Sequence, residues 1–597
     1  MSLLCLLIAA QSMGFLVWRR AHQARLVETA YRLMTGLCVC AVVIITAGSL
    51  GSLVLARALV CVIAAAGLVG LVVYRRRKPA EPAPDPPRPA FSWMEWLCIG
   101  VVAASLIIAA ISVFAPPTDW DAVVAHLALP AQYAQLGHIT VFEGNTYSGY
   151  PHLLHTLYTF AYCGAGETGA QFVSWLFAFL ACVFAYAVGE RLAGRLCGLL
   201  SAAIFATTPV FFDQAGVASL DVAVTAVVLG ALGALLAWHD EKRLDCLLMA
   251  GFLAGSASGI RHTGYIVCVL LAVGVLVSGK PANIRAAAAF SAMAALGAAP
   301  WLLRSWLAVG NPVYPFFQDL FPSDVLVNVD FTSLGGHASR RGAALYEVVW
   351  FPWRIVMHPA RFDGWNASPG GLIFALGIPG VVIGGKRVRM LGLFCLCGVV
   401  FFFFFQHYAR YLLPFFAAMM PVAAFAACRL PKARWAAYTA LVFTFAVGLI
   451  LGLGMNHFKI PAALGTTPRE TYLAQRVERY GAFQRMNELL EEGGAVFTLD
   501  PRTYYFEGPT FRNLEPLRTL IDAPLDDQLR WFARRDIRYL FYPVEYVNTT
   551  PVFTTSGLIE LFKQWRNTPE TFRPIEHMQV ISRNGAEEVI IFEIVSP

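Results

Sequence analysis

Runs of apolar residues follow one another along most of this chain, and short clusters of Lys and Arg separate them. A membrane-crossing helix needs about 20 apolar residues, and many of these runs approach that length. Because the bilayer interior offers no hydrogen-bond partners, such runs must form helices. The composition agrees: 57% of the 597 residues are hydrophobic, 14% are charged, and the mean hydropathy is +0.59. We predict an α-helical, polytopic membrane protein.

The positions of the basic residues exclude nucleic acid as a partner and indicate how the spans are oriented in the membrane. The net charge of +7 comes from Lys and Arg in short groups between apolar runs, which is typical of cytoplasmic loops and not of a nucleic-acid site. The 13 Cys lie mostly inside apolar runs without zinc spacing, so we interpret them as small packing residues.

The charge pattern divides the chain into four regions and predicts about 14 spans, three of them before a cytoplasmic Pro-rich linker. The segment Leu153 to Cys163 is too short to cross, and we expect it at the outer interface. From residue 455 onward helix and strand patterns alternate, as in a water-exposed, extracytoplasmic α/β domain. The regions are 1–74 (N-terminal spans), 75–95 (linker), 96–454 (core, with outer loops 115–169 and 308–370) and 455–597 (C-terminal domain).

The C-terminal domain has distinct local patterns. Arg469 to Leu490 is predicted to form one helix. Three short apolar runs are predicted to form strands: Ala495 to Leu499, Ile537 to Tyr542, and Val589 to Ile594.

Two carboxylates lie in the loop that opens the core. Asp119 and Asp121 follow a charge-free apolar run, in the sequence APPTDWDAVVAHLALP. A carboxylate just past the end of a span can stay ionised and still face a lipid-borne substrate. The alternative is that Thr118 or Asp119 caps the next helix. If the chain turns helical at Trp120, a spacing of two places the carboxylates on different faces, so that one of them caps or orients.

Three arginines near the outer ends of spans are candidates for binding an anion. Arg261 turns a hairpin of two short apolar halves, and Arg304 and Arg410 lie at span boundaries. An Arg in apolar surroundings costs about 3 kcal/mol and usually faces a cavity, and its planar fork binds two phosphate oxygens. The alternative is that these side chains snorkel to lipid headgroups.

These features occur in an order found in a known family. After the acidic loop come Tyr150-Pro151, the run TTPVFFDQAGVASLD that ends at Asp221, the turn GIRHTG, and the runs WLLRSWLAVGNPVYPFF and HYARYLLP. From Trp96 to Gly454 the chain resembles the GT-C-fold glycosyltransferases of family 39, which include protein O-mannosyltransferases and lipid A aminoarabinose transferases. That family usually carries an Asp-Glu pair in its first outer loop. Here the sequence is Asp119-Trp120-Asp121, which leaves open which carboxylate corresponds.

The resemblance implies sugar transfer, usually with inversion, from a polyprenyl-phosphate donor such as undecaprenyl phosphate to a lipid, glycan or protein acceptor. Inverting transfer needs a base for the acceptor hydroxyl and cations for the leaving phosphate. We predict Asp121 as the base, with Asp119 as the alternative. The predicted donor-phosphate ligands are Arg261, His262, Arg304, Arg410 and Tyr411, and the predicted acceptor contacts or supporting residues are His126, Asp221 and His407.

Two other functions stay open on the sequence. An oligosaccharide ligase or oligosaccharyltransferase would use a polyprenyl-diphosphate donor at the same face. A lipid or solute transporter would also have many spans, but the sequence shows neither inverted repeats nor a charge in mid-span. No cluster has metal-site spacing, although a loop carboxylate is able to bind a divalent cation. We expect a bacterial inner membrane location, with the site and the C-terminal domain facing the periplasm or exterior.

Overall fold

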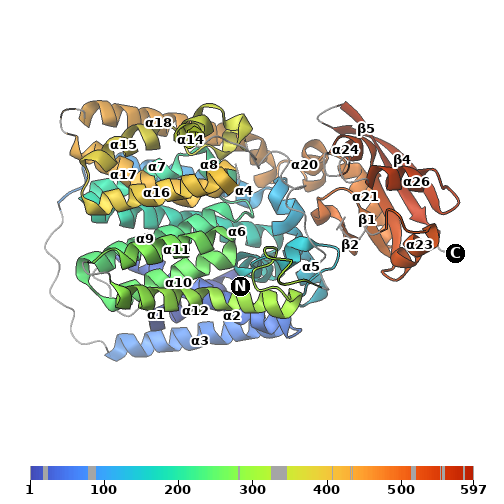
Figure 1. Cartoon of the computed structure of the whole chain (residues 1–597), viewed down its shortest axis with the longest axis horizontal. Helices are drawn as coiled ribbons and strands as arrows, with labels where there is room; N and C mark the ends of the chain where they lie inside the picture. Colours follow the sequence, from blue (N-terminus) through green and yellow to red (C-terminus); the bar gives the residue numbers. More distant parts are fainter. Residues whose placement is uncertain are drawn as a thin grey trace.

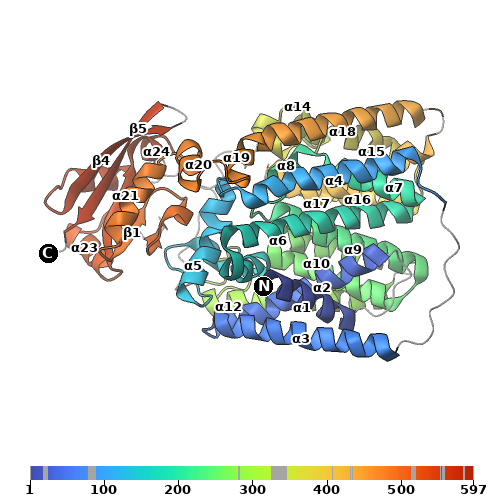
Figure 2. The same cartoon turned by 180° about the vertical axis from the view of Figure 1, so that it is seen from behind.

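A bundle of long helices carries a small mixed domain at one end in the computed structural model (Figure 1). The helices run roughly along the long axis of the bundle, which the view from behind also shows (Figure 2). The chain ends in the mixed domain, away from the bundle. The structure describes all residues except 1, 18–24, 78–88, 280–282, 324–345, 363, 406–407, 431, 433, 513–519, 551–552, 554–557, 583–584 and 596–597. Most of the predicted linker therefore lies outside the described residues.

Ten of the described helical segments are long and apolar enough to cross a membrane, and four apolar helices are shorter. They fall where the sequence predicts spans, but length and composition support only ten, so the count of about 14 stays a prediction. The long segments contain α2 (Arg25–Ser49), α3 (Leu53–Arg77), α4 (Trp93–Phe114), α6 (Leu153–Ala193), α9 (Asp221–Glu241), α12 (Ile284–Val309), α15 (Leu372–Ile383), α16 (Lys386–Phe405), α17 (Leu413–Arg429) and α18 (Arg434–Asn456). The shorter helices are α1 (Ser2–Val17), α7 (Arg195–Ala206), α10 (Leu244–Ile260) and α11 (Thr263–Leu276).

The longest helix, α6, differs from the prediction at its start. The segment expected at the interface is the first part of α6, and its residues from Leu153 to Ala161 are all buried. An interfacial helix keeps one face in water. Here α5 (Ala128–Leu136) packs against α6, and Ser2 at the start of α1 lies against Gly164. A kink at Ala165 and Gly166 separates this covered part from the rest of α6.

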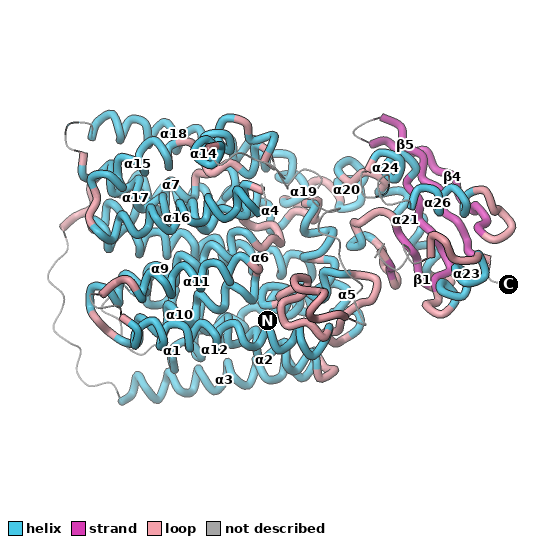
Figure 3. Tube along the Cα trace, in the orientation of Figure 1, coloured by secondary structure: helices cyan, strands magenta, loops and turns pink. Residues whose placement is uncertain are grey.

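The C-terminal domain is built on a five-stranded mixed sheet with strand order β2-β1-β3-β5-β4 (Figure 3). Strand β1 pairs in parallel with β2 and β3, and β5 pairs in antiparallel fashion with β3 and β4. The three predicted strands are confirmed as β1, β3 and β5, whereas β2 and β4 were not predicted. The strands are β1 (Ala495–Thr498), β2 (Thr510–Phe511), β3 (Ile537–Pro543), β4 (Phe572–Ser582) and β5 (Gly585–Ile594).

Helices cover both faces of this sheet, because side chains alternate along each strand. Phe497 and Leu540 pack with the apolar residues of α23 and α26 in one cluster. Val496 and Phe541 pack with those of α20 and α21 in another. The helices are α20 (Arg469–Arg476), α21 (Tyr480–Leu490), α23 (Leu525–Ala533), α24 (Val544–Thr549) and α26 (Leu558–Arg566).

The single helix predicted from Arg469 to Leu490 is wrong, because it is divided into α20 and α21. The break lies at Arg479, which has a φ of +66°, in the left-handed region. Its buried guanidinium binds Asp500 and Glu587. These distant partners interrupt a pattern that is helical on both sides.

Candidate active site

The chain that follows α4 carries both acidic residues. Helical geometry resumes at Trp120, and a π-helix, η1 (Ala122–His126), leads into α5. The Asp119 Oδ1 accepts a hydrogen bond from the Ala122 N–H at 3.4 Å, so Asp119 takes the capping position that the sequence analysis considered. Asp121 makes no capping hydrogen bond. The two carboxylates therefore have different partners, as the spacing of two predicts.

Two aspartate–arginine ion pairs meet beside this loop. Asp121 pairs with Arg410, and the buried Asp221 at the start of α9 pairs with Arg261 in the turn between α10 and α11. The ring centre of Tyr411 lies 3.8 Å from Arg261 Cζ and 5.8 Å from Arg410 Cζ. A guanidinium has five N–H donors, and it keeps its positive charge in an ion pair with a carboxylate. The fold thus gathers two arginines around one aromatic ring at the end of the core that carries the acidic loop.

Asp119 has an unusual electrostatic environment. Burial and the negative charges of Asp213 and Asp121 raise the pKa of Asp119 from 3.8 to about 7, against the opposing effect of Arg410 and Lys459. A carboxyl group with such a pKa exchanges its proton near neutral pH, which is the property a general base needs. Asp213 belongs to α8 (Pro209–Gln214), and Lys459 ends the short helix η7 (His457–Lys459) after α18.

His126 lies in the same electrostatic environment, and its side chain is uncharged there. Burial and the positive charges of Arg261 and Arg410 lower its pKa to about 3. Its Nδ1 lies 2.9 Å from His155 Nε2. The neutral imidazole can donate or accept a hydrogen bond but adds no positive charge, which suits a contact role and not phosphate binding.

Arg304 and His262 do not join this group through any of their described contacts. The Arg304 guanidinium donates to the carbonyl oxygens of Ser148 (2.7 Å) and Tyr150 (3.2 Å). The His262 Nε2 lies 2.9 Å from the Tyr314 carbonyl oxygen. These bonds hold the first outer loop and the chain after α12 against the core. A structural role accounts for these contacts, and phosphate binding by Arg304 and His262 stays a prediction.

Two further expectations concern His407 and a bound metal ion. His407, predicted to line the site, lies outside the described residues, as does its neighbour at 406. Within the part of the chain that the structure describes, no group of three or more His, Cys, Asp or Glu has the arrangement of a metal site.

The C-terminal domain contacts the acidic loop directly. The Tyr505 hydroxyl donates to the Pro117 carbonyl oxygen at 2.9 Å, and Arg512 Nη1 donates to the Val124 carbonyl oxygen at 2.7 Å. Val123 packs into the apolar cluster on one face of the sheet. The residues on either side of Asp119 and Asp121 are thus held by a domain that begins more than 300 residues later.

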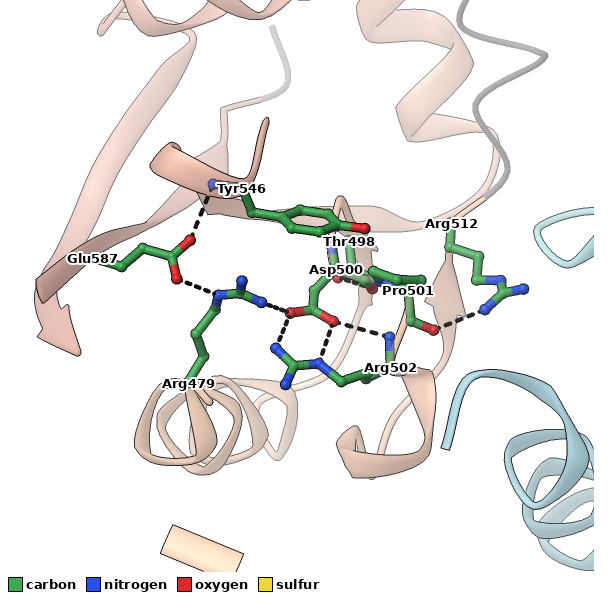
Figure 4. A network of polar contacts seen from close by, with 8 residues as sticks. All are labelled: Arg479, Thr498, Asp500, Pro501, Arg502, Arg512, Tyr546 and Glu587. Atoms are coloured by element: carbon green, nitrogen blue, oxygen red, sulfur yellow. Dashed lines mark hydrogen bonds and ion pairs between the residues drawn. The ribbon is translucent and has the colours of Figure 1, made fainter. Parts of the chain in front are cut away.

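A buried polar network supports these contacts (Figure 4). Asp500, after β1, binds Arg479 at 2.5 Å and Arg502 at 2.6 Å, and Arg479 also binds Glu587 of β5 at 2.9 Å. Burial acts to raise the pKa of Asp500, but the guanidinium groups of Arg502 and Arg479 prevail and lower it to about 2. Arg512 Nη1 donates to the Pro501 carbonyl oxygen at 2.7 Å as well as to Val124. The network therefore fixes the segment that reaches the acidic loop.

Sequence reasoning missed several of these residues. Asp213 stands in the same run as Asp221, TTPVFFDQAGVASLD, and a second acid at the outer end of a span was a usable signal. Lys459 follows the last predicted span directly, and a basic residue beside a span end was a usable signal. Tyr505 and Arg512 gave no local signal, because only the docking of the C-terminal domain brings them to the loop.

Comparisons with known proteins agree with this arrangement. The family model described as dolichyl-phosphate-mannose-protein mannosyltransferase matches residues 153–304. The crystal structure of ArnT from Cupriavidus metallidurans bound to undecaprenyl phosphate aligns with a TM-score of 0.55 at 13% identity, over 85% of this chain and 99% of that chain. The arabinofuranosyltransferase AftD from Mycobacteria aligns with a TM-score of 0.49 at 13% identity, over 85% of this chain and 40% of that chain. A search of curated proteins gave no match.

Together, the helical bundle, the acidic loop and the C-terminal sheet define a multi-pass membrane protein of the GT-C fold. The resemblance to GT-C glycosyltransferases that the sequence shows is confirmed by the family model over residues 153–304 and, for the fold, by the ArnT structure. The predicted helical GT-C fold with a C-terminal α/β domain is confirmed, whereas the count of about 14 spans and the extracytoplasmic side of that domain stay predictions.

Proposed function

We propose that the protein is a membrane glycosyltransferase that moves a sugar, with inversion, from a polyprenyl-phosphate donor to a hydroxyl group of a lipid, glycan or protein. One observation carries this proposal: two arginine–aspartate pairs meet at Tyr411 beside Asp119, a loop carboxyl whose pKa is raised to about 7. A base and fixed cations are the groups that such a transfer requires. The ArnT structure of the same fold holds undecaprenyl phosphate.

In this proposal Arg261 and Arg410 bind the phosphate of the donor. Asp221 and Asp121 hold the two guanidinium groups in place, and these cationic groups bind phosphate oxygens. Tyr411 lies against both groups and keeps their spacing. As the bond between the sugar and the phosphate breaks, the bonding pair leaves with the phosphate oxygen, and the two arginines stabilise the added charge.

The proposed base is Asp119. The sequence analysis expected Asp121 in this role, but Arg410 engages the Asp121 carboxylate. Asp119 forms no ion pair within the described part of the chain, and its pKa of about 7 suits proton transfer near neutral pH. Asp119 would take the proton of the acceptor hydroxyl while the acceptor oxygen bonds to the anomeric carbon of the sugar. Asp121 would orient Arg410.

The proposed orientation places the acidic loop and the C-terminal domain outside the cytoplasm. The bundle end opposite to the acidic loop carries basic residues: Arg195 binds Glu95 at the start of α4, and Arg387 binds Asp240 near the end of α9. Basic clusters mark the cytoplasmic side of membrane proteins. In a bacterial inner membrane, the site would then face the periplasm.

Mass spectrometry of envelope glycolipids, glycans and glycoproteins tests the function. Cells that lack the protein should lose one sugar residue from a defined product, and cells that express Asp119→Asn should lose the same residue. Identical profiles with and without the protein would overturn the proposal. Loss of a whole oligosaccharide would instead identify a ligase or oligosaccharyltransferase with a diphosphate donor.

A further inference from the structure

A cavity lies outside the site described above, where the C-terminal domain meets the first outer loop. Its volume is about 490 Å³, within the range of small-molecule binding sites. Ala128, Ala131 and Gln132 of α5 form one wall, and residues of α21 and η8 (Thr503–Tyr505) form the other. Figures 1 and 2 show α5 and α21 on the two sides of this junction. Neither the bundle nor the domain forms the cavity alone.

The lining combines aromatic rings with side-chain amides. Rings offer flat apolar faces, and amides offer both donors and acceptors. The nitrogen atoms of three of these amides are occupied: Asn487 Nδ2 donates to the Tyr505 carbonyl oxygen at 2.9 Å, Gln484 Nε2 to Glu470 at 3.0 Å, and Gln132 Nε2 to the Thr510 hydroxyl at 3.0 Å. The lining includes Tyr162, Tyr480, Phe506, Gln132, Gln484 and Asn487.

Two buried polar atoms of the lining residues lack a partner within the described part of the chain. They are the side-chain oxygen of Gln132 and the hydroxyl of Thr503. The Gln132 amide nitrogen is occupied, because it donates to the Thr510 hydroxyl at 3.0 Å. Buried polar groups in folded proteins normally have hydrogen-bond partners, so each of these two side chains is able to form one more hydrogen bond.

The charged residues that line the cavity disfavour a phosphate ligand. Arg469 binds Glu167 at 2.7 Å, so its charge is already balanced, while Glu470 and Glu507 add negative charge. This balance disfavours a phosphate, and the polar lining disfavours a lipid chain. A neutral molecule with many hydroxyl groups and apolar C–H faces matches both the amides and the rings.

We propose that this cavity binds a saccharide, as the glycan part of the acceptor. The cavity adjoins the reaction site, because its lining residue Tyr505 donates a hydrogen bond to Pro117, in the loop of Asp119. A sugar chain held here is positioned to present a further hydroxyl to that loop. The assignment of the saccharide to the acceptor rests on the proposed function, whereas saccharide binding itself does not.

Calorimetric titration of the full-length protein in detergent with free trisaccharides of mannose, arabinose and N-acetylglucosamine tests the inference. The wild-type protein should bind at least one of them saturably. Ala131→Phe fills the cavity and should abolish this binding, whereas Ala134→Phe, on the same helix but outside the lining, should retain it. Thr503→Val keeps the shape but removes the unpartnered hydroxyl, and should weaken binding by about fivefold.

Three results would overturn the inference: no binding of any trisaccharide, binding that both Ala131→Phe and Thr503→Val leave unchanged, or saturable binding of a Ser- and Thr-containing peptide in place of the sugars. The titration needs no transfer activity, so a failure of the proposed function would leave its result intact. If both hold, Thr503→Val should raise the KM for a glycan acceptor and leave kcat within about twofold.

Discussion

Asp119 is the residue whose protonation state should control the rate. A base acts in its ionised form, so a pKa of about 7 predicts that kcat/KM rises with pH and levels off above about 7. Asp119→Asn keeps the size of the side chain but removes its basicity, and should lower the rate by about 10²–10⁴-fold at pH 8. Initial rates of sugar transfer between pH 5 and 9 measure both effects. An unchanged transfer rate in Asp119→Asn together with an inactive Asp121→Asn would show that Asp121 is the base.

Protein stability gives a second measurement at Asp119. Its folded-state pKa lies above the ordinary value of 3.8, so the neutral carboxyl contributes stability that is complete below about pH 4 and is lost as pH rises through about 7. Asp119→Asn cannot ionise and avoids this loss. The Tm of the variant should therefore fall less than that of the wild type between pH 5 and 8. Parallel Tm curves would show that Asp119 is not perturbed.

Arg261 and Arg410 should differ from Arg304 in what their loss affects. Arg261→Ala or Arg410→Ala removes charge-assisted hydrogen bonds to phosphate and should raise the Kd for undecaprenyl phosphate by about tenfold or more. Arg304→Ala removes bonds to the carbonyl oxygens of Ser148 and Tyr150, so it should lower the Tm while the folded protein binds normally. The Kd for undecaprenyl phosphate, measured in detergent, distinguishes a loss of phosphate binding from a loss of stability. Equal loss of affinity for undecaprenyl phosphate in all three variants would show that Arg304 also binds the phosphate.

At the scale of secondary-structure elements, the segment after β1 should position the acidic loop. Arg512 joins the Pro501 and Val124 carbonyl oxygens, so Arg512→Ala frees the loop without touching a carboxylate. A displacement of about 1 Å can cost about 10²-fold in rate, and we expect a fall of 10- to 100-fold in kcat with the C-terminal domain still folded. Steady-state kinetics and limited proteolysis of the domain measure the two properties.

Arg530 supplies the matched control in the same domain. It lies exposed on α23 and pairs only with the neighbouring Asp527 among the contacts described. Exposed ion pairs of this kind contribute little, so Arg530→Ala should leave kcat unchanged. If Arg512→Ala behaves like Arg530→Ala, the domain does not position the loop.

For the whole molecule, the prediction concerns which end faces the outside. A membrane-impermeant thiol label should reach Gln564→Cys, on the exposed surface of α26, in spheroplasts. It should fail at Gly385→Cys, which lies exposed in the turn between α15 and α16 and has room for a side chain. Labelling of the parent chain corrects for its own cysteines. Reversed labelling would place the C-terminal domain and the acidic loop in the cytoplasm.

Hydropathy and charge along the sequence were sufficient for the membrane class, the places of the apolar helices and three of the five strands. These properties depend on local residue patterns: a run of apolar residues has only one stable state in a bilayer, and alternation predicts a strand wherever it occurs. The acidic loop and the turn at Arg261 were also evident, because a charge beside an apolar run is conspicuous. The break at Arg479 was not, since its partners lie elsewhere in the chain.

Only the tertiary structure decided which charges pair and that Asp119 has no ion pair among the described residues. Asp121 and Arg410 lie 289 residues apart, and nothing near either residue indicates the other. The raised pKa of Asp119 comes first from burial and then from the negative charge of Asp213, which lies on a separate helix. The cavity exists because α5 and α21 meet. Pairing energies and burial depend on distance in space, and a sequence read along the chain does not contain that distance.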